Sequence, residues 1–381
     1  MKRLFFITLT IFITAAACAA ADPVAPDSTG RRNLIQRVIA YFDDANRVKQ
    51  RDKFDISVVG GPHYSSDSKF GLGILAAGTY NLDRNDTLDL LRSNVAIVAD
   101  ATTAAHYKVS LEGENIFPAD RSRLTYDIEF SSIETKYWGI GYDNCRNDDN
   151  ESKYRYLAVA ADVSHTWRLG QRFYIGPMVT LNYTDGRKFE RPEIWAGEQS
   201  RAFAWGPGLT ARYDTRDNLT EPHTGVALRL DQLLCNRWLG NSRGFCINEL
   251  TASIYRPLWK GAVLASRLHW RMTWGDTPWC FLSSIGGSHD MRGYFEGRYR
   301  DKNVIDVCVE LRQHVWRRNG VVAWMGAAAL FPRFSAIRFS RILPNAGVGY
   351  RWEFKHRMNV RADIGFGRHQ TGFILSINEA F

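Results

Sequence analysis

Apolar and polar side chains alternate one residue at a time through most of residues 54–381, and this period of two constrains the fold more than any other feature. In the segment MNVRADIGF (358–366), Asn359, Arg361 and Asp363 stand between apolar residues. A β-strand points successive side chains to opposite faces, so such a segment has one apolar and one charged face. The sequence therefore predicts an all-β fold. The same alternation recurs in three further segments: 226–231, 264–274 and 305–314.

The alternating segments are long, and aromatic residues stand at their ends. Many have about ten or more residues, as tilted membrane strands do, whereas strands of soluble sheets average about five to six. Trp274, Trp316 and Trp352 suit the interfacial girdles of a membrane barrel. Outside the N-terminus, no apolar run approaches the ~20 residues of a membrane helix. Since only a closed barrel satisfies every backbone group of a sheet in lipid, we predict a transmembrane antiparallel β-barrel.

The number of strands follows from counting these segments. Seventeen stretches within 54–381 have the strand pattern, but the stretch 278–285 is too short to span a bilayer and belongs to a long loop. The remaining sixteen give the even number expected of a bacterial barrel. Short connections alternate with long ones, such as that at about 274–302, which predicts short periplasmic turns and long outer loops.

The N-terminus has the regions of a secretory signal peptide. A positively charged start precedes an apolar stretch, and small residues lead to Ala21, after which we expect cleavage. Cys18 leaves a lipoprotein alternative, although an alanine replaces the leucine usual three positions before the lipidated cysteine. We therefore expect a signal peptide (1–21), a periplasmic linker with a short amphipathic helix (22–53) and an outer-membrane barrel (54–381).

The charge pattern argues against a nucleic-acid partner. The formal net charge is +9, but Lys and Arg are spread singly rather than clustered on a helix or tail. Export of the chain argues in the same direction. We expect these residues to face the barrel lumen and anionic lipid.

Enzymatic chemistry finds no support in the motifs. The sequence contains no G-x-S-x-G, and its nine histidines show no metal-binding spacing. Ser288, His289 and Asp290 are adjacent in sequence, a spacing that does not produce a catalytic triad. We therefore expect no catalytic, cofactor-binding or metal-binding residues.

Two segments resemble motifs of the BamA/TamA outer-membrane assembly superfamily. YDTRDNLTEPHTG (213–225) resembles its D-x-R-D-N…P-x-x-G turn, and IGGSHDMRGYFEGRYRDKN (285–303) resembles the G-G…R-G-[FY] motif of its long sixth outer loop. Glu310 and Arg312 match its E-x-R on the next strand. The motifs occur in the family's order, and the resemblance covers residues 54–381.

The resemblance implies that the sixth loop enters the lumen and that Arg292 meets acidic residues of the wall. Gly326 stands where the family's wall aspartate is expected. We therefore predict a bidentate Arg292–Glu310 pair, with Asp306 and Arg312 nearby balancing the charge. The glycines of the motif would let the loop pass close to the wall. The predicted loop motif consists of Gly286, Gly287, Arg292, Gly293 and Tyr294.

We expect the turn motif to be a structural network in which Pro222 and Gly225 set the backbone. Binding of a periplasmic ligand by its charged residues is the alternative. The motif residues are Asp214, Arg216, Asp217, Asn218, Pro222 and Gly225.

The last predicted strand, TGFILSINEAF (371–381), resembles the C-terminal recognition signal of outer-membrane barrels. Its alternation predicts Phe373 and Phe381 on one face, together with Leu375 and Ile377. We expect the cell's assembly machinery to read this segment as an insertion signal.

Five cysteines follow the signal peptide, and two of them bracket one predicted outer loop. Cys235 and Cys246 flank a short polar segment in an oxidising compartment. We therefore predict a disulfide between them.

The functional expectation rests on the resemblance. Family members that assemble other barrels carry POTRA modules before the barrel, and the 32 residues from 22 to 53 are too few for one. The chain thus resembles the POTRA-less members: an outer-membrane barrel of a Gram-negative bacterium that assists protein or lipid insertion or transport. Expected partners are outer-membrane lipids, the barrel assembly machinery and a separate periplasmic chain. The alternative is a passive pore or structural barrel, which needs neither the loop motif nor a weak seam between first and last strands.

Overall fold

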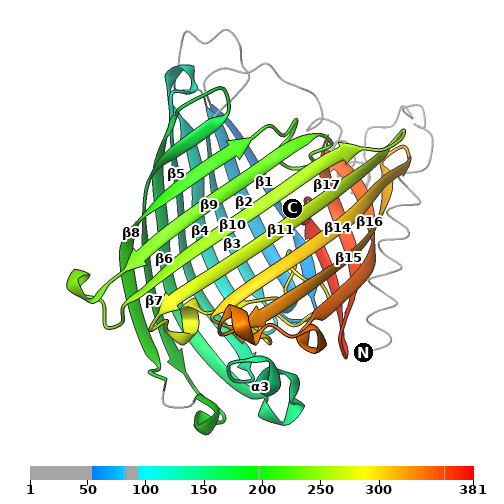
Figure 1. Cartoon of the computed structure of the whole chain (residues 1–381). Coiled ribbons are helices and arrows are strands. Elements are labelled where there is room, and N and C mark those ends of the chain that lie inside the picture. The colour runs from blue at the N-terminus through cyan, green and yellow to red at the C-terminus, as the bar shows by residue number, and fades with distance from the viewer. Residues whose placement is uncertain (1–53, 81, 83–92, 196–197, 356) are drawn as a thin grey trace, which may run out of the picture. The chain divides into compact units, whose positions relative to one another are not determined.

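The computed structural model describes residues 54–80, 82, 93–195, 198–355 and 357–381, which form a closed antiparallel barrel of sixteen strands (Figure 1). The predicted fold and strand number are confirmed. The expected signal peptide and amphipathic helix lie outside the described residues.

The wall strands follow one another around the barrel in chain order, and the last pairs with the first. They are β1 (Phe54–Ser65), β2 (Lys69–Tyr80), β3 (Ser93–Thr102), β4 (Tyr107–Ile116), β5 (Ser122–Tyr137), β6 (Ser152–Arg168), β7 (Phe173–Arg187), β8 (Arg201–Asp214), β9 (Gly225–Cys235), β10 (Phe245–Pro257), β11 (Ala262–Gly275), β14 (Asn303–Trp316), β15 (Asn319–Phe331), β16 (Leu343–Lys355), β17 (Met358–Gly367) and β18 (Gln370–Ile377).

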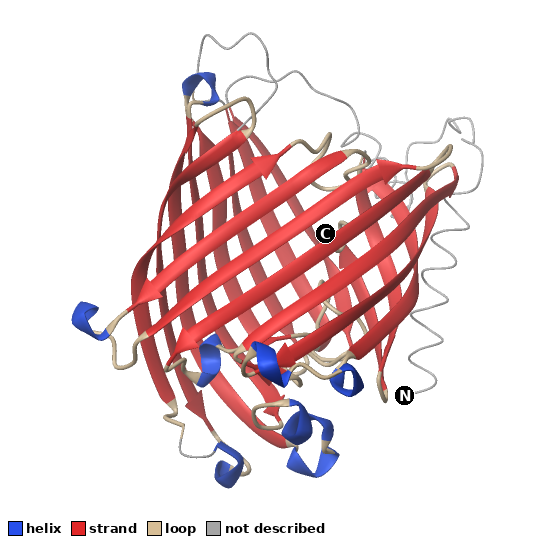
Figure 2. Cartoon of the chain, viewed as in Figure 1, coloured by secondary structure: helices blue, strands red, loops and turns tan. Residues whose placement is uncertain are grey.

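The remaining elements are short and belong to the connections (Figure 2). Two-residue strands β12 (Ser283–Ser284) and β13 (Arg300–Asp301) pair with each other between β11 and β14. The stretch 278–285 thus belongs to a loop, as predicted. No helix among the described residues is long and apolar enough to cross a membrane. The helical elements are η1 (Pro118–Asp120), α3 (Tyr142–Arg146), η2 (Asp148–Asn150), η3 (Pro192–Trp195), η4 (Arg237–Leu239), η5 (Trp279–Phe281), η6 (Phe334–Ala336) and η7 (Phe339–Arg341).

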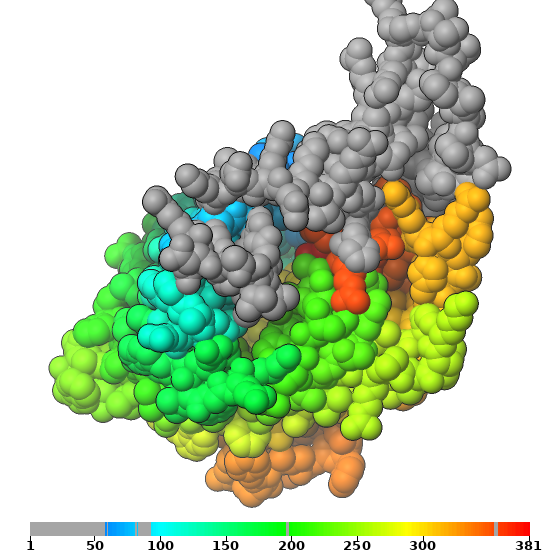
Figure 3. Space-filling view, turned by 90° about the horizontal axis from the view of Figure 1, so that it is seen from above, coloured from blue at the N-terminus to red at the C-terminus, as the bar shows by residue number. Residues whose placement is uncertain are grey.

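The residue alternation maps onto the two faces of the wall. In β17, Asn359, Arg361 and Asp363 are buried in the interior, whereas Ile364 and Phe366 are exposed on the outer surface. Lipid solvates the outer side chains, while the polar ones meet partners inside the barrel. Figure 3 looks along the barrel from above and shows the strand colours following one another around this wall.

The two ends of the barrel differ. We call one the long-loop end, because it carries the connections with α3, η3, η4, η5, η6 and η7 (Figure 1, below). Three of these connections are named loop 5 (236–244), loop 6 (276–302) and loop 7 (332–342). The opposite short-turn end carries turns such as 258–261 and 317–318.

Aromatic residues fill the interior near the long-loop end. Trp279 at the start of loop 6 packs edge-on against Trp195 at a centroid distance of 4.8 Å, and Trp195 stacks on Tyr137 of the wall at 4.2 Å. These rings are almost fully buried. Loop 6 is therefore fixed at its base before it turns into the lumen.

Candidate functional site

Loop 6 lies directly against the wall because glycines meet there. Gly286, Gly287 and Gly293 all have positive φ angles, between 90° and 112°, which residues with side chains rarely adopt. A Cβ added to Gly293 would lie 2.6 Å from the carbonyl carbon of Gly365 in β17, and a Cβ on Gly365 would collide with the Arg292 carbonyl oxygen. The loop backbone therefore touches the strand backbone, as expected from the motif.

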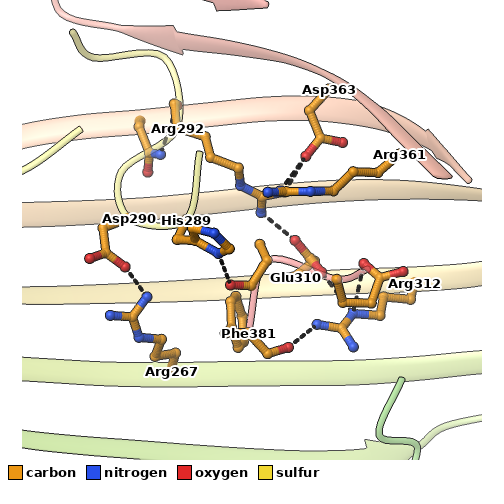
Figure 4. Close-up of polar contacts among 12 residues, drawn as sticks. Arg267, His289, Asp290, Arg292, Glu310, Arg312, Arg361, Asp363 and Phe381 are labelled. Atoms are coloured by element: carbon orange, nitrogen blue, oxygen red, sulfur yellow. Dashed lines mark hydrogen bonds and ion pairs between the residues drawn. The ribbon is translucent and has the colours of Figure 1, made fainter. Parts of the chain in front are cut away.

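Arg292 is the most buried charge that loop 6 brings into the lumen, with 1% of its surface exposed. Its Nη2 donates to Glu310 of β14, and its Nη1 donates to Asp363 of β17 at 2.7 Å (Figure 4). Its guanidinium also lies 3.7 Å from the ring centroid of Trp324 in β15. Both carboxylates are fully buried. The loop is thus tied to three strands through one side chain.

The predicted Arg292–Glu310 contact is present, but its predicted bidentate form is wrong. The two outer nitrogens of the guanidinium divide between Glu310 and Asp363, because these carboxylates approach from different strands. The lumenal aspartate that the sequence lacks at Gly326 in β15 is supplied two strands later, by Asp363 in β17. Sequence alternation had placed Asp363 on the polar face of its strand, but not beside Arg292.

Further arginines complete the charge arrangement around these acids. Arg312 donates to Glu310 at 2.7 Å, and Asp363 accepts from Arg351 at 2.5 Å and from Arg361 at 3.2 Å. Arg361 also donates to the Ser288 carbonyl oxygen of loop 6 at 2.7 Å. We call Glu310, Arg312, Trp324, Arg351, Arg361 and Asp363 the socket of Arg292.

Asp306 does not join the socket, which corrects its predicted role. It contacts His269 Nδ1 at 2.7 Å, and His269 Nε2 lies 3.1 Å from Glu249. The register that pairs His269 with Asp306 across β11 and β14 brings the two together, four residues from Glu310. The partner of Asp306 is therefore His269 of the neighbouring strand β11, not Arg292.

Tyr294 anchors loop 6 nearer the long-loop end. Its hydroxyl donates to the Pro344 carbonyl oxygen at 2.7 Å and accepts from the Arg368 amide at 2.8 Å. Gly367 lies against the tyrosine ring, where a Cβ would lie 2.7 Å from it. The predicted loop motif thus holds two wall contacts, one through Arg292 and one through Tyr294.

The chain leaves the sheet after Ile377, so the predicted last strand is too long. Asn378 has a φ of 64°, in the left-handed region that asparagine tolerates, and residues 379–381 turn into the lumen. Phe381 packs there against Tyr255, Val263 and Ala265. Its predicted place on one strand face with Phe373 is therefore wrong. Its role as an insertion signal stays a prediction.

These last residues, which we call the tail (378–381), contact both the socket and loop 6. Glu379 accepts from Arg351 at 2.8 Å and from Asn359 at 2.9 Å. The Phe381 carbonyl oxygen accepts from Arg312 at 2.8 Å (Figure 4). His289 Nδ1 lies 2.9 Å from the Ala380 carbonyl oxygen. The tail and loop 6 thus belong to one network, which the arginines of the socket connect.

The junction of β1 and β18 is much shorter than every other strand pairing of the wall. Among the described residues it has two register pairs, Tyr64 with Leu375 and Ser65 with Ile374, whereas β1 pairs with β2 along all twelve of its residues. The Ser66 amide also donates to the Phe373 carbonyl oxygen at 3.1 Å. We call this junction the seam.

Pro62 explains where the seam stops. Hydrogen-bonded pairs alternate along an antiparallel ladder, so after Ser66–Phe373 the next are Tyr64–Leu375 and Pro62–Ile377. Proline has no amide hydrogen to donate to the Ile377 carbonyl oxygen. The ladder therefore ends at the residue where β18 also ends.

Loop 6 bridges the two strands of the seam at the long-loop end. The Phe295 amide donates to Gln370 Oε1 at the start of β18, at 2.9 Å. The next amide, of Glu296, donates to Asp67 Oδ2 in the β1–β2 turn, at 2.8 Å. Two consecutive loop residues thus hold β18 and the β1–β2 turn together.

Asp67 and Glu296 are an acidic pair at this bridge. Burial raises the pKa of Asp67 to about 6, against the opposing effect of the hydrogen bond from the Glu296 amide. Burial, with repulsion from Asp67, raises the pKa of Glu296 to about 7. Both carboxyls therefore hold protons more tightly here than in water.

The turn motif forms the predicted structural network and also reaches the opposite wall. Asp214 binds the Arg216 side chain at 2.6 Å, and Asp217 accepts from the amides of His223 and Thr224. Pro222 is fully buried, Asn218 accepts from the Thr220 and Glu221 amides, and Gly225 has a φ of 112°.

The contacts of the turn with the opposite wall are made by two acidic residues. Asp217 accepts a hydrogen bond from Arg357. Glu221 accepts one from Asn359, which also binds Glu379 of the tail. The turn therefore connects to the tail across the short-turn end.

The predicted disulfide is wrong. Cys235 and Cys246 are both free thiols. Cys235 stands opposite Phe245 and packs inside with it, whereas Cys246 stands opposite Leu234. Since neighbouring strand residues point to opposite faces, the two thiols lie on different sides of the wall.

Comparison with known proteins agrees with this architecture. The Omp85 superfamily domain matches residues 95–339, which is more than half of the chain. No curated protein matches the sequence significantly.

Three solved structures share the fold. BamA from Haemophilus ducreyi lacking POTRA domains 1–3 aligns with a TM-score of 0.57 at 13% identity, covering 87% of this chain and 71% of that one. CdiB from Escherichia coli aligns with a TM-score of 0.56 at 12% identity, covering 92% and 72%. CdiB from Acinetobacter baumannii aligns with a TM-score of 0.54 at 12% identity, covering 86% of this chain and 60% of that one. The chain belongs to the Omp85 superfamily, and its barrel is of the BamA/TamA type.

Proposed function

We propose that this outer-membrane barrel assists the insertion or secretion of polypeptides, and that it does so by opening at the seam. The observation that carries the proposal is the contrast within the wall: two register pairs join β1 to β18, beside ladders such as the thirteen pairs of β10 with β11. Each lost backbone pair removes about 0.5–1.5 kcal/mol of net hydrogen-bond stabilisation. The seam is therefore the place where the wall separates at least cost.

Loop 6 is the element that controls this opening in our proposal. Its bridge through Phe295 and Glu296 holds the seam, while Arg292 holds the loop. The barrel acts by binding and conformational change, without a catalytic step. BamA and CdiB share its fold, which favours a polypeptide as the transported species.

The short-turn end is the side from which a client or periplasmic partner would arrive. A cavity of about 500 Å³ lies there, lined among others by His223, Trp259, Arg318 and Glu353. The turn motif lies at the same end and contacts the tail through Asn359. Partner binding at this turn would therefore act on the tail before it acts on the seam.

A disulfide across the seam tests the proposal. Ser65 and Ile374 form a non-hydrogen-bonded pair, whose Cβ atoms lie close enough for a disulfide. We expect proteoliposomes with the wild-type chain to accelerate folding of an unfolded eight-stranded barrel, scored by heat-modifiable migration. The oxidised Ser65→Cys/Ile374→Cys variant should lose this acceleration and regain it on reduction.

The controls separate the alternatives. Each single cysteine variant should behave as the wild type under oxidising conditions. A passive pore would show steady conductance in planar bilayers that the disulfide leaves unchanged. Equal activity of the locked and unlocked forms, or no activity in the wild type, would overturn the proposal.

A further inference from the structure

Loop 7 repeats one tripeptide and presents it on rigid turns. Arg-Phe-Ser occurs at 333–335 and again at 338–340, and each copy leads into a 3₁₀ turn, η6 or η7. The turns are closed by hydrogen bonds such as Ala336 N to Arg333 O at 2.9 Å and Arg341 N to Arg338 O at 3.0 Å. The loop therefore displays its side chains from a fixed backbone.

The apolar side chains of loop 7 point away from the protein. Phe339 is 92% exposed and Phe334 is 61% exposed, with Ile337 also exposed between them. Phe334 covers Phe331, the last residue of β15, at a centroid distance of 5.4 Å. By strand alternation Phe331 lies on the same side of β15 as the exposed Val321 and Met325, but Phe331 itself is buried. Phe334 thus covers the outer end of β15, and the exposed aromatics of loop 7 lie beyond it.

The charge of loop 7 has one sign. Residues 332–342 contain Arg333, Arg338 and Arg341 but no acidic residue. Arg341 binds Asp143 at 2.6 Å, whereas Arg333 and Arg338 have no ion pair within the described part of the chain. Among the residues that the structure describes, these two guanidiniums therefore lack an anionic partner.

Loop 5 provides the contrast within the same molecule. It also exposes an aromatic residue, Trp238, which is 70% exposed. Its arginines are paired, however: Arg243 binds Glu198 at 3.0 Å, and Arg237 lies 3.8 Å from Asp276. Exposed aromatics alone therefore do not distinguish loop 7; its unpaired positive charge does.

We propose that loop 7 binds anionic phosphorylated lipids of the membrane leaflet around the long-loop end. Guanidinium groups match phosphate oxygens in bidentate geometry, so Arg333 and Arg338 would hold head groups. Phe334 and Phe339 would enter the acyl boundary beside them, as aromatics do at membrane interfaces. This lipid contact does not depend on the proposed function of the seam.

Proteolysis in nanodiscs tests the contact. Chymotrypsin cleaves after Phe334 and Phe339 in loop 7 and after Trp238 in loop 5. For the wild-type chain, cleavage of loop 7 should be about thirtyfold slower in phosphatidylglycerol–phosphatidylcholine discs than in phosphatidylcholine discs, as two basic residues at an anionic surface imply. Added salt should reduce this difference, and cleavage at Trp238 should be the same in both.

Matched variants separate charge from folding. Arg333→Gln/Arg338→Gln keeps both cleavage sites and should lose the dependence on lipid charge. Arg237→Gln/Arg243→Gln makes the same charge change in loop 5 and should keep the protection of loop 7. Heat-modifiable migration checks that each variant is folded.

Three results would overturn the inference. One is equal cleavage of wild-type loop 7 in the two lipids, and another is unchanged protection in the Arg333/Arg338 variant. The third is rapid cleavage in both discs together with protection in native outer membranes that Arg333→Gln/Arg338→Gln keeps, which would show that a protein covers the loop.

Discussion

The socket of Arg292 and the seam lie in the same barrel wall, but they are held together in opposite ways. In the socket, Glu310 and Asp363 are fully buried and are contacted by four arginines, each placed by a different strand or loop. At the seam, two register pairs and one loop bridge join neighbouring strands. Buried charges cost several kcal/mol to separate, whereas a short ladder costs about one per bond. The wall is thus held by buried ion pairs beside loop 6 and by few backbone hydrogen bonds where β1 meets β18.

The largest expected effect comes from breaking the socket. Arg292→Ala leaves two buried carboxylates without their shared partner, which should destabilise loop 6 by about 3–5 kcal/mol. We expect faster proteolysis of loop 6 and a lower temperature for the heat-modifiable transition. Arg292→Lys should not restore stability, because an ammonium cannot divide between the two carboxylates as the planar fork does.

A double-mutant cycle shows whether the pair acts as a unit. Arg292→Ala/Glu310→Ala should be little worse than either single variant, since Asp363 keeps Arg351 and Arg361. Fully additive effects would contradict the socket as described.

The second effect concerns the tail, which lies between the two regions. Phe381→Ala removes a ring from its contact with Tyr255, Val263 and Ala265 and should cost about 1–2 kcal/mol, because the ring is only half-buried. Hydrogen exchange of the Ala380 and Phe381 amides should rise. Phe381→Leu keeps most of the apolar contact and should change the exchange rates little. Equal exchange rates in the wild type and in Phe381→Ala would show that the ring does not hold the tail in this contact.

The third effect comes from a variant that should lengthen the seam by one backbone pair. Pro62→Ala supplies the missing amide, so the Pro62–Ile377 pair can form and add about 1 kcal/mol. Exchange of the Ile377 amide should slow, and client folding in proteoliposomes should slow with it.

Gly61→Ala is the matched control for this variant. Residue 61 directs its backbone groups toward β2, and nothing lies within 4 Å of an added Cβ. It should therefore leave the seam unchanged. A seam that fails to lengthen in Pro62→Ala would show that proline does not set its end.

The smallest effect is a pH dependence of the bridge. The folded pKa of Asp67, about 6, and that of Glu296, about 7, exceed their ordinary values. Their contribution is therefore fully present at low pH and is lost as the pH rises through about 6 to 7. Lys69 and Lys136 face Asp67 and oppose part of this loss.

Thermal midpoints at pH 5 and pH 8 measure this difference. We expect the free energy of unfolding to differ between the two pH values by well under about 1 kcal/mol. Solvent reaches Asp67 and the exposed Glu296 and weakens the effect of burial on their pKa values. Asparagine cannot ionise, so Asp67→Asn should reduce the difference between the two pH values. Asp143→Asn, in the connection between β5 and β6, should leave this difference as in the wild type. If Asp67→Asn shows the same difference between pH 5 and pH 8 as the wild type, the acidic pair is not the cause of the pH dependence.

Sequence alternation was sufficient to predict the strands of the wall and their two faces, because each strand carries its own pattern. It placed Asp363 on the polar face of β17, and the family motif placed Arg292 in the lumen. Their contact depends on barrel closure and loop path, which bring together residues 71 positions apart. A pattern within one strand contains no information about such a distance.

The errors arise where local structure departs from the strand pattern. The pattern extends to Phe381, but Asn378 adopts a left-handed conformation and Glu379 finds arginines inside the barrel. Cys235 and Cys246 are suitably spaced for a disulfide, but the register places them on opposite faces. Pro62 is visible in the sequence, yet which neighbour it faces follows only from the pairing of Ser66 with Phe373.

The contact between Gly293 and Gly365 has a consequence for the order of assembly. Loop 6 touches the wall backbone at a point where no side chain fits, and Arg292 is enclosed by β14, β15 and β17. Inserting a charged loop into a finished lumen would require Arg292 to lose its hydration while it passes side chains that already fill the interior. We therefore expect the C-terminal strands to assemble around the loop. If the seam opens as proposed, joining β18 to β1 is the last step of folding and the first step that opening reverses.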